Sequence, residues 1–525
     1  MTSDLSISRL RRRLAHTWRP FFGRFGNLTE VQIRTIPAVL QGHSVVVSAP
    51  TASGKTEAVV APVAERHTAE GWPGLAVVYV VPTRALANDL FERLEDSLGE
   101  NYLSALLKHG DRPTLPDREI HWLITTPESL DSLLCRRPHL FTTLRTIIID
   151  EIHLLDSTYR GDQLRVLVAR LRQTSTAPVL NVHLLSATLP NPEQLARRYT
   201  EDFQLIQVSN PRPINAHFAN THQEVLDLAL RRRWRKLLYF CNTRQSVEEV
   251  AAQVKELWKP YPVVTHHGSL DRHARAEAEE VMKQNAVAVC VSTSTLEIGI
   301  DIGDIDLVVL AEPPWSLESL QQRVGRGSRR SQTIEAVAVC RTDEEQTVLQ
   351  LMFAAAASGA YHSNDYKPDR SVIVQQSLSI LYQARTGIPR QTLADFMKPL
   401  GTQEEVRAII NHLGDKGYCL ELGDQLYPSS DLLDLGEEGK IHSNIPDQND
   451  YQVIDADSGK PVGRIRGSFD QTFLLAGRTW KVLMVQGNQV TVGRSPHGGA
   501  SASFGMQRNV GQFYYLLPPS LRDPR

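Results

Sequence analysis

Short apolar runs alternate with helical stretches from about residue 30 to residue 340, and this alternation constrains the fold more than any other feature. Brief segments rich in Val, Ile and Leu, separated by longer amphipathic stretches, are typical of strands in parallel α/β sheets. The pattern breaks at Pro211-Arg212-Pro213 and then starts again. We therefore predict two tandem α/β domains, each built on a parallel sheet. The expected strands are 45–48, 76–81, 122–125, 145–149 and 182–186 in the first, and 236–241, 262–265, 286–291, 306–310 and 334–340 in the second.

Two smaller modules are predicted after a polar linker at residues 359–370. Helical runs at 371–385, 391–397 and 402–416 precede short strands at 418–422 and 425–427, the plan of a winged-helix domain. An ordinary helical packing domain is the alternative. From residue 431 onward apolar and polar residues alternate, which predicts a small antiparallel β-domain. The expected domains are 1–212, 213–365, 366–430 and 431–525.

Composition restricts the function classes. The sequence is 41% hydrophobic and has no apolar run of about 18 residues, so no membrane span is expected. The basic N-terminus (Arg9, Arg11, Arg12, Arg13) lacks the apolar core of a secretory signal, and we interpret it as a leading helix or an arm that contacts nucleic acid. Five cysteines without C-x-x-C spacing argue against a zinc ribbon or an iron–sulfur cluster and predict a cytoplasmic location. The net charge of −2 means that any bound strand must lie in a locally positive groove.

A phosphate-binding loop is predicted between the strand 45–48 and the helix that follows it. The segment Ala49–Thr56 ends in Gly54-Lys55-Thr56, where backbone N–H groups cradle phosphates and Lys55 reaches the β and γ groups. The hydroxyl of Thr56 is suited to hold Mg²⁺. Ala49 stands where the strict pattern has Gly. The assignment of a phosphate loop therefore depends largely on the strand before it and the helix after it.

Two carboxylates follow the apolar run 146–149. Asp150 and Glu151 are therefore expected at the carboxyl edge of a central strand, where parallel sheets bind their ligands. Asp150 suits Mg²⁺ bound through water, and Glu151 suits polarisation of an attacking water. A solvated strand end is the alternative for an isolated acidic pair.

The segment 321–330 is rich in arginine. Arg323, Arg326 and Arg329 recur at regular spacing around Gly325 and Gly327. We expect Arg326 and Arg329 to reach the γ-phosphate across a cleft, a contact worth on the order of 10³ to 10⁵ in rate. A solvated face or a nucleic-acid patch is the alternative.

These three elements, in this order, resemble the superfamily 2 DExH-type helicases, and the resemblance implies that the two parallel-sheet domains are RecA-like. That resemblance implies an ATP site made of Phe25, Gln32, Thr51, Ala52, Ser53, Gly54, Lys55, Thr56, Gly299 and Asp301. It implies nucleic-acid contacts at Thr83, Arg84, Thr126, Pro127, Thr243, Arg244, Gly268 and Thr293, and coupling between the two sites at Ser186 and Thr188. The implied catalytic set is Lys55, Asp150, Glu151, Gln322, Arg326 and Arg329, and the implied cofactors are ATP and Mg²⁺.

Within that superfamily the chain is similar to the large helicase-related (Lhr) family core. The resemblance rests on the segments 296–303, 313–316 and 322–326, and on the C-terminal segments 442–446, 463–465 and 474–480. It implies an ATP-dependent motor that acts mostly on DNA and moves 3′ to 5′. Ser328 stands where the general helicase motif has Gly, which weakens the assignment of Arg329 relative to that of Arg326. Ala52 stands where many relatives have Gly. The chain is also shorter than the family core, so part of the C-terminal module is expected to be reduced or supplied by a protein partner.

Three other functions stay open: an RNA or RNA–DNA hybrid helicase with the same motor, a scaffold that only binds nucleic acid, and a nuclease–helicase fusion. A nuclease fusion would require a cluster of metal ligands, and the sequence after Gly359 shows none, because His442 and His497 are interpreted as isolated. Only about 20 residues separate Asp301 from Gln322, which leaves little room for a long strand-separating hairpin. We expect the wedge to be Trp315, the winged helix or the β-rich tail. DNA repair is one of several pathways that such a motor serves.

Overall fold

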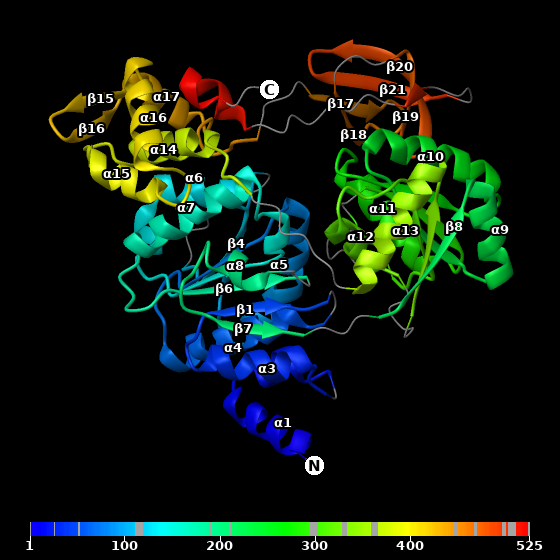
Figure 1. Ribbon diagram of the computed structural model, residues 1–525, viewed down its shortest axis with the longest axis horizontal. Coiled ribbons are helices and arrows are strands. Elements are labelled where there is room, and N and C mark those ends of the chain that lie inside the picture. The colour runs from blue at the N-terminus through cyan, green and yellow to red at the C-terminus, as the bar shows by residue number, and fades with distance from the viewer. Residues whose placement is uncertain are drawn as a thin grey trace. The chain divides into compact units, whose positions relative to one another are not determined.

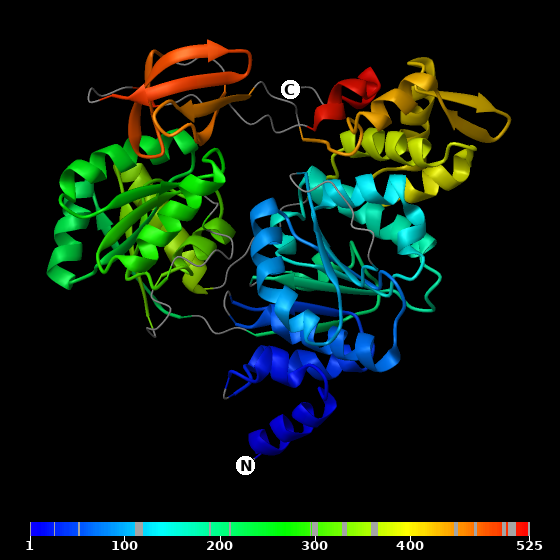
Figure 2. The same ribbon diagram turned by 180° about the vertical axis from the view of Figure 1, so that it is seen from behind.

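The computed structural model describes residues 2–25, 27–50, 53–110, 119–187, 191–208, 212–293, 296, 303–327, 333–358, 366–445, 450–466, 470–495, 500–501 and 511–522. The chain divides into two compact units. The first comprises Met1–Ser209, Ser363–Pro446 and Arg508–Arg525, and the second comprises Asn210–His362 and Asp447–Gln507. Each unit contains a parallel sheet and one additional module (Figure 1, Figure 2). Among the described helices, none is both long and apolar enough to cross a bilayer.

The first unit is built on a seven-stranded parallel sheet with the order β3-β4-β2-β5-β6-β1-β7. Its central strands are buried on both faces, as expected when helices cover a sheet on both sides. The register pairs Val46 with Leu184 and Tyr79 with Ile148. The strands are β1 (Val45–Ser48), β2 (Val77–Val80), β3 (Ala105–Lys108), β4 (Trp122–Thr125), β5 (Thr146–Ile149), β6 (Asn181–Ser186) and β7 (Gln204–Gln207). The helices are α1 (Thr2–Arg13), α2 (Trp18–Phe22), α3 (Glu30–Leu40), α4 (Lys55–Glu70), α5 (Arg84–Gly99), α6 (Pro127–Arg136), α7 (Tyr159–Thr174) and α8 (Pro192–Ala196).

A helical module, residues 366–445, belongs to the same unit and packs on α6 and α7 (Figure 1). Three of its helices precede a hairpin, as predicted, and a fourth helix at Ser430–Glu437 follows the hairpin, where the sequence predicted the start of the β-rich tail. The apolar residues Leu378, Leu393 and Ile409 lie in its core, and Phe513 and Leu517 from the returning chain end join them. The elements are α14 (Ser371–Gln383), α15 (Arg390–Met397), α16 (Gln403–Asp415), α17 (Ser430–Glu437), and the sheet β14-β16-β15 made of Ile388–Pro389, Gln425–Pro428 and Cys419–Leu422.

The second unit repeats the parallel plan with the strand order β10-β11-β9-β12-β13-β8. The neighbouring strands β9 and β12 pair in parallel, with Phe240 opposite Leu310 at their carboxyl ends. The strands are β8 (Ile214–Ala219), β9 (Lys236–Phe240), β10 (Val263–His266), β11 (Ala288–Ser292), β12 (Leu307–Leu310) and β13 (Ile334–Val339). The helices are α9 (His222–Arg232), α10 (Arg244–Leu257), α11 (Arg272–Gln284), α12 (Leu317–Val324) and α13 (Asp343–Ser358).

A β-rich module, called the β-domain here and made of residues 450–501, packs on the second unit's sheet lobe through α10 and α11. Its strand order is β18-β17-β21-β20-β19-β22. Most pairs are antiparallel, as predicted, but β17 pairs with β21, and β19 with β22, in parallel. Its core holds Val453, Phe473 and Trp480 together with Leu270 of the lobe. The strands are β17 (Asp450–Asp455), β18 (Pro461–Arg466), β19 (Thr472–Leu475), β20 (Arg478–Gln486), β21 (Gln489–Arg494) and β22 (Ala500–Ser501).

The predicted fold class is confirmed: two tandem parallel-sheet lobes, a module of three helices and a hairpin, and a small β-rich module. The tail that we treated as one segment, 431–525, contributes to both units, because residues up to Pro446 and from Arg508 onward belong to the first. The bounds of the four domains remain a prediction.

Candidate nucleotide and nucleic-acid sites

The predicted phosphate loop connects β1 to the N-terminus of α4. Gly54 directly precedes the helix with φ of 81°, a conformation that favours glycine. Lys55 is buried, and its Nζ donates to the carbonyl oxygens of Ala49 (2.8 Å) and Pro50 (3.0 Å). The Ser53 hydroxyl donates to Pro50 as well (2.7 Å). The loop therefore places a lysine and a helix N-terminus together, the arrangement that binds phosphates.

Helix α3 contacts this loop through Gln32. The Thr29 hydroxyl and the Gln32 side chain form a capping box at the start of α3. The same two side chains continue to the loop: Thr29 donates to the Ser53 carbonyl (2.8 Å) and Gln32 to the Gly54 carbonyl (3.4 Å). Gln32 thus lies beside the phosphate loop, as the resemblance implies. Phe25 is half exposed, with the Arg24 guanidinium 4.9 Å from its ring centroid.

Asp150 and Glu151 follow β5 at the carboxyl edge of the first sheet. Asp150 accepts a hydrogen bond from the Tyr79 hydroxyl (2.7 Å) and one from the Glu151 backbone N–H (2.8 Å). Burial, together with the negative charge of Glu151, raises the pKa of Asp150 to about 6. The positive charge of Lys55 acts in the opposite direction and lowers the pKa of Asp150. Lys55 therefore interacts electrostatically with this carboxylate. The edge of this sheet therefore combines a lysine with two carboxylates.

The His153 ring lies between Glu151 and the predicted coupling residue Ser186. His153 Nδ1 lies 3.4 Å from Glu151 Oε2 and 3.0 Å from the Ser186 hydroxyl. Glu151 itself has φ of 47°, which is rare for a residue with a side chain. Such strained backbone occurs mainly where function requires it. Neither His153 nor Tyr79 is assigned a role from the sequence, because their contacts depend on the tertiary fold.

The two predicted strand-contact segments of the first unit are held together by Arg160. Thr83 caps α5, and Thr126 precedes Pro127 at the start of α6. The Arg160 guanidinium donates to the Pro82 carbonyl (2.6 Å) and pairs with the Glu128 carboxylate (2.6 Å). Arg160 therefore connects the segments that carry Thr83, Arg84, Thr126 and Pro127, a role with no signal in the sequence.

The second unit brings Thr243, Arg244 and Gly268 together. Thr243 caps α10, and Arg244 Nη1 donates to the Ser269 hydroxyl (2.8 Å), next to the exposed Gly268. Thr293 is buried, and its N–H donates to His266 (3.3 Å). Gln322 lies on α12, and Arg326 follows that helix with its side chain buried. The role of Arg326 at the γ-phosphate remains a prediction.

Several predicted site residues lie outside the described residues: Thr51, Ala52, Thr188, Gly299, Asp301 and Arg329, as does His497. Their assigned roles remain predictions.

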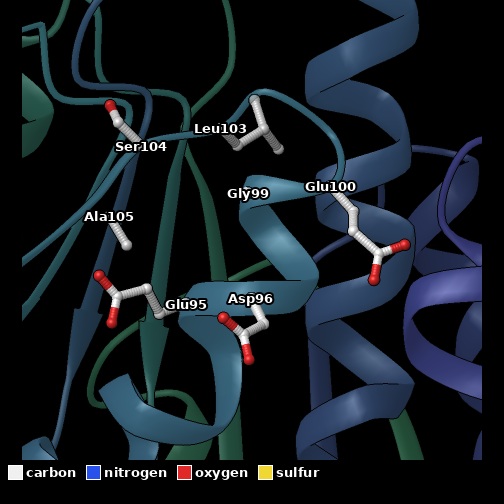
Figure 3. A pocket seen from close by; sticks show the side chains of 7 residues that line it. All are labelled: Glu95, Asp96, Gly99, Glu100, Leu103, Ser104 and Ala105. Carbon is white, nitrogen blue, oxygen red and sulfur yellow. The ribbon is translucent and has the colours of Figure 1, made fainter.

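A hollow near the end of α5 is unsuited to phosphate (Figure 3). Three carboxylates, from Glu95, Asp96 and Glu100, line it together with Leu103 and Ser104. Their negative charge would repel a nucleotide or a nucleic-acid backbone. We assign it no part in either site.

The interpretation of His442 as isolated is wrong. The fold returns it to α6, where ligand atoms of Asp131, Cys135 and His442 lie within 4.8 Å of one another. The Arg170 guanidinium donates to Asp131 (2.8 Å) and to Cys135 (3.2 Å), so a metal ion would add a second positive charge to a buried space. Burial also raises the pKa of Cys135 to about 11, which favours the neutral thiol over the thiolate that binds metals. We interpret the cluster as structural.

Known families match most of both parallel lobes. The DEAD/DEAH box helicase family matches residues 29–195, and the helicase conserved C-terminal domain matches residues 220–331. ATP-dependent helicase Lhr-Core protein 2 of Thermococcus barophilus is 27% identical over 91% of the chain, and ATP-dependent helicase Lhr-Core of Methanocaldococcus jannaschii is 28% identical over 93%. The chain spans 63% and 64% of the length of these two relatives.

Solved structures share the fold. The Mycobacterium smegmatis helicase Lhr, bound to single-stranded DNA and AMP-PNP, matches with a TM-score of 0.70 and 23% identity, over 83% of this chain and 62% of that one. The DUF1998 helicase MrfA, bound to DNA and AMPPNP, matches with a TM-score of 0.72 and 20% identity, over 92% of this chain and 72% of that one.

Proposed function

Because the chain belongs to the superfamily 2 helicases and resembles their Lhr core, we propose that it is an ATP-dependent motor that tracks along single-stranded DNA from 3′ to 5′ and separates duplexes. One observation supports the proposal most: Lys55, Asp150 and Glu151 gather at the carboxyl edge of one parallel sheet, beside a helix N-terminus. That combination suits phosphoryl transfer from a nucleoside triphosphate to water.

Each residue has a proposed task in hydrolysis. The amides at the start of α4 and the Lys55 ammonium bind the β- and γ-phosphates of the substrate ATP. Glu151 orients the attacking water and accepts its proton. His153 contacts both the Glu151 carboxylate and the Ser186 hydroxyl, and so restricts the position of the carboxylate relative to Ser186. Thr56 and Asp150 would hold Mg²⁺, which neutralises charge on the phosphates when bound. Arg326, and Arg329 with it, would stabilise the charge that develops on the γ-phosphate.

Each unit has a set of segments at the ends of its strands that is proposed to contact the nucleic acid. In the first unit the proposed contacts are Thr83, Arg84, Thr126 and Pro127, positioned by Arg160. In the second unit they are Thr243, Arg244, Gly268 and Thr293. Helix caps and backbone amides of this kind bind phosphate oxygens rather than base edges. We therefore expect binding that is largely independent of sequence.

DNA is the proposed polymer because the Lhr and MrfA structures named above are bound to it. RNA or an RNA–DNA hybrid is the second candidate, since contacts to the backbone discriminate weakly between sugars. A scaffold that only binds strands has no need of Lys55, Asp150 and Glu151 in one place. The further proposed partners are ATP and a protein that binds the C-terminal β-domain.

ATPase measurements with no polymer, single-stranded DNA, RNA or a tailed duplex test the proposal. We expect the largest stimulation with single-stranded DNA and with duplexes that carry a 3′ tail. Stimulation by RNA alone would contradict the choice of polymer, and unwinding of only 5′-tailed duplexes would contradict the direction.

A further inference from the structure

Within the second unit, the β-domain contacts the parallel-sheet lobe at the loop His267–Ser269, which contains the predicted strand contact Gly268. The Arg464 N–H donates to the Ser269 carbonyl (2.7 Å), and the Asp271 N–H donates to the Val462 carbonyl (3.0 Å). Between them Leu270 pairs with Gly463 in an antiparallel bridge. This close approach requires glycine, because a Cβ at residue 463 would lie 2.6 Å from the Ser269 oxygen.

The carboxylate of Glu248 holds the same loop from α10. It is fully buried, and one of its oxygens lies 2.9 Å from His267 Nε2. The same oxygen accepts the Ala476 N–H (2.8 Å), and the other accepts the Gly477 N–H (2.8 Å). Hydrogen bonds to a charged acceptor are about twice as strong as neutral ones, and a buried carboxylate needs them.

The turn between β19 and β20 is shaped to bind this carboxylate. Ala476 and Gly477 both have positive φ, 57° and 65°. Consecutive residues in this conformation form the tight turns of hairpins, and their N–H groups can make a concave anion site. Glu248 fills that site from the lobe, so one side chain joins α10, the loop and the β-domain.

We infer that Glu248 is a positioning residue for strand binding, and that the β-domain sets the geometry of the loop His267–Ser269 through it and through Gly463. This inference rests on the proposed function, because it assumes that the loop contacts nucleic acid. Loss of the Glu248 link would loosen Gly268 and Ser269, whereas the ATP-binding residues of the first unit would keep their contacts.

Two substitutions perturb the loop from opposite sides. Glu248→Gln keeps the shape of the side chain but presents an amide N–H₂ to a backbone N–H. Gly463→Ala pushes the Ser269 carbonyl from the β-domain. Each has a matched control: Glu249→Gln changes an exposed carboxylate next in sequence, and Gly493→Ala adds a Cβ that meets only the flexible end of Leu483 at 3.2 Å.

The experiment measures the ATPase rate of the full chain against the concentration of single-stranded DNA and, separately, of ATP. Glu248→Gln and Gly463→Ala are expected to raise the DNA concentration that gives half-maximal stimulation about tenfold, within the usual range of coupling between sites. The KM for ATP is expected to stay within about twofold, and both controls are expected to behave as the parent.

The possible failures are distinguishable. If neither DNA nor RNA stimulates the parent chain, the proposed function fails and this inference fails with it. If the parent is stimulated but both variants respond as the parent does, the positioning role alone is overturned. If the variants raise the KM for ATP as much as the DNA requirement and melt at lower temperature, Glu248 has only a general structural role, and the inference is again overturned.

Discussion

Replacing Asp131 by Asn is expected to destabilise the joint between the first parallel lobe and its helical module. The Asp131 carboxylate is fully buried and accepts hydrogen bonds from Arg170 (2.8 Å) and Ser379 (2.5 Å). It also accepts from the side-chain amides of Gln163, Gln375 and Gln376, at 2.8–3.1 Å. Burial alone would raise the pKa of Asp131, but Arg170 and the surrounding donors hold it below its usual range.

The magnitude follows from what the Asp131→Asn substitution would leave behind. An amide cannot accept at its N–H₂ group, so some donors lose their partner, and the buried Arg170 guanidinium loses its counter-charge. Removing one partner of a buried ion pair costs about 3 to 5 kcal/mol, whereas replacing both partners by apolar residues is often neutral. We therefore expect a loss of about 4 kcal/mol in Asp131→Asn, and only partial recovery in the double variant Asp131→Leu/Arg170→Met, because Ser379 and the glutamine amides lose this acceptor.

Urea unfolding at pH 7, followed by circular dichroism and by limited proteolysis of the helical module, measures this effect. The exposed pair Asp395–Lys398 on the same module provides the control, because Asp395→Asn is expected to change nothing measurable. A loss below about 1 kcal/mol in Asp131→Asn would refute the view that this network holds the module.

Three further outcomes follow from the site and its surroundings. Lys55→Ala and Glu151→Gln should each lower the ATPase rate at least about a hundredfold, and hydrolysis retained in Glu151→Gln would contradict its role. Burial lowers the pKa of His442 from 6.5 to about 4, so the folded chain binds this proton less readily than the unfolded chain, and stability falls as pH decreases from about 6.5 toward 4. Between pH 7.5 and pH 5 the loss is about 2 kcal/mol; urea unfolding of His442→Gln should show a smaller loss, and an unchanged pH dependence would disprove this cause. Trp315 is 80% exposed before α12, and Trp315→Ala should slow unwinding while DNA-stimulated hydrolysis persists; equal unwinding rates would exclude it as the wedge.

The central strands could be predicted from the sequence because each is a continuous apolar run buried on both faces. The missed strands β3, β7, β8, β14 and β22 all lie at sheet edges. Strand β7, with the sequence Gln-Leu-Ile-Gln, is largely exposed. It therefore lacks the continuous apolar run that identifies a buried strand. An edge strand is defined by its neighbour rather than by its own pattern.

The candidate sites divide in the same way. Lys55, Asp150, Glu151 and Gln32 stand in short motifs whose local context implies a phosphate site. The residues that position the site segments, such as Tyr79, His153, Arg160 and Glu248, make contacts that span from 19 residues of the chain (Glu248 to His267) to 229 residues (Glu248 to Gly477). No local spacing encodes such contacts.

The same limit applies to the tail. The return of His442 and Phe513 to the core beside α6 and α14 depends on the topology of the whole first unit. This return of the chain also decides which variants can test the function of the β-domain. Removal of residues 431–525 would take Leu432, Ile441 and Phe513 out of that core, so point substitutions are the better probe of the β-domain.

The most direct test of the proposed motor is the ATPase rate of the full chain with and without single-stranded DNA at saturating ATP and Mg²⁺. We predict slow hydrolysis by the chain alone, strong stimulation by single-stranded DNA, and loss of both rates in Glu151→Gln. Hydrolysis that is unaffected by any nucleic acid, or no hydrolysis at all, would contradict the proposed motor.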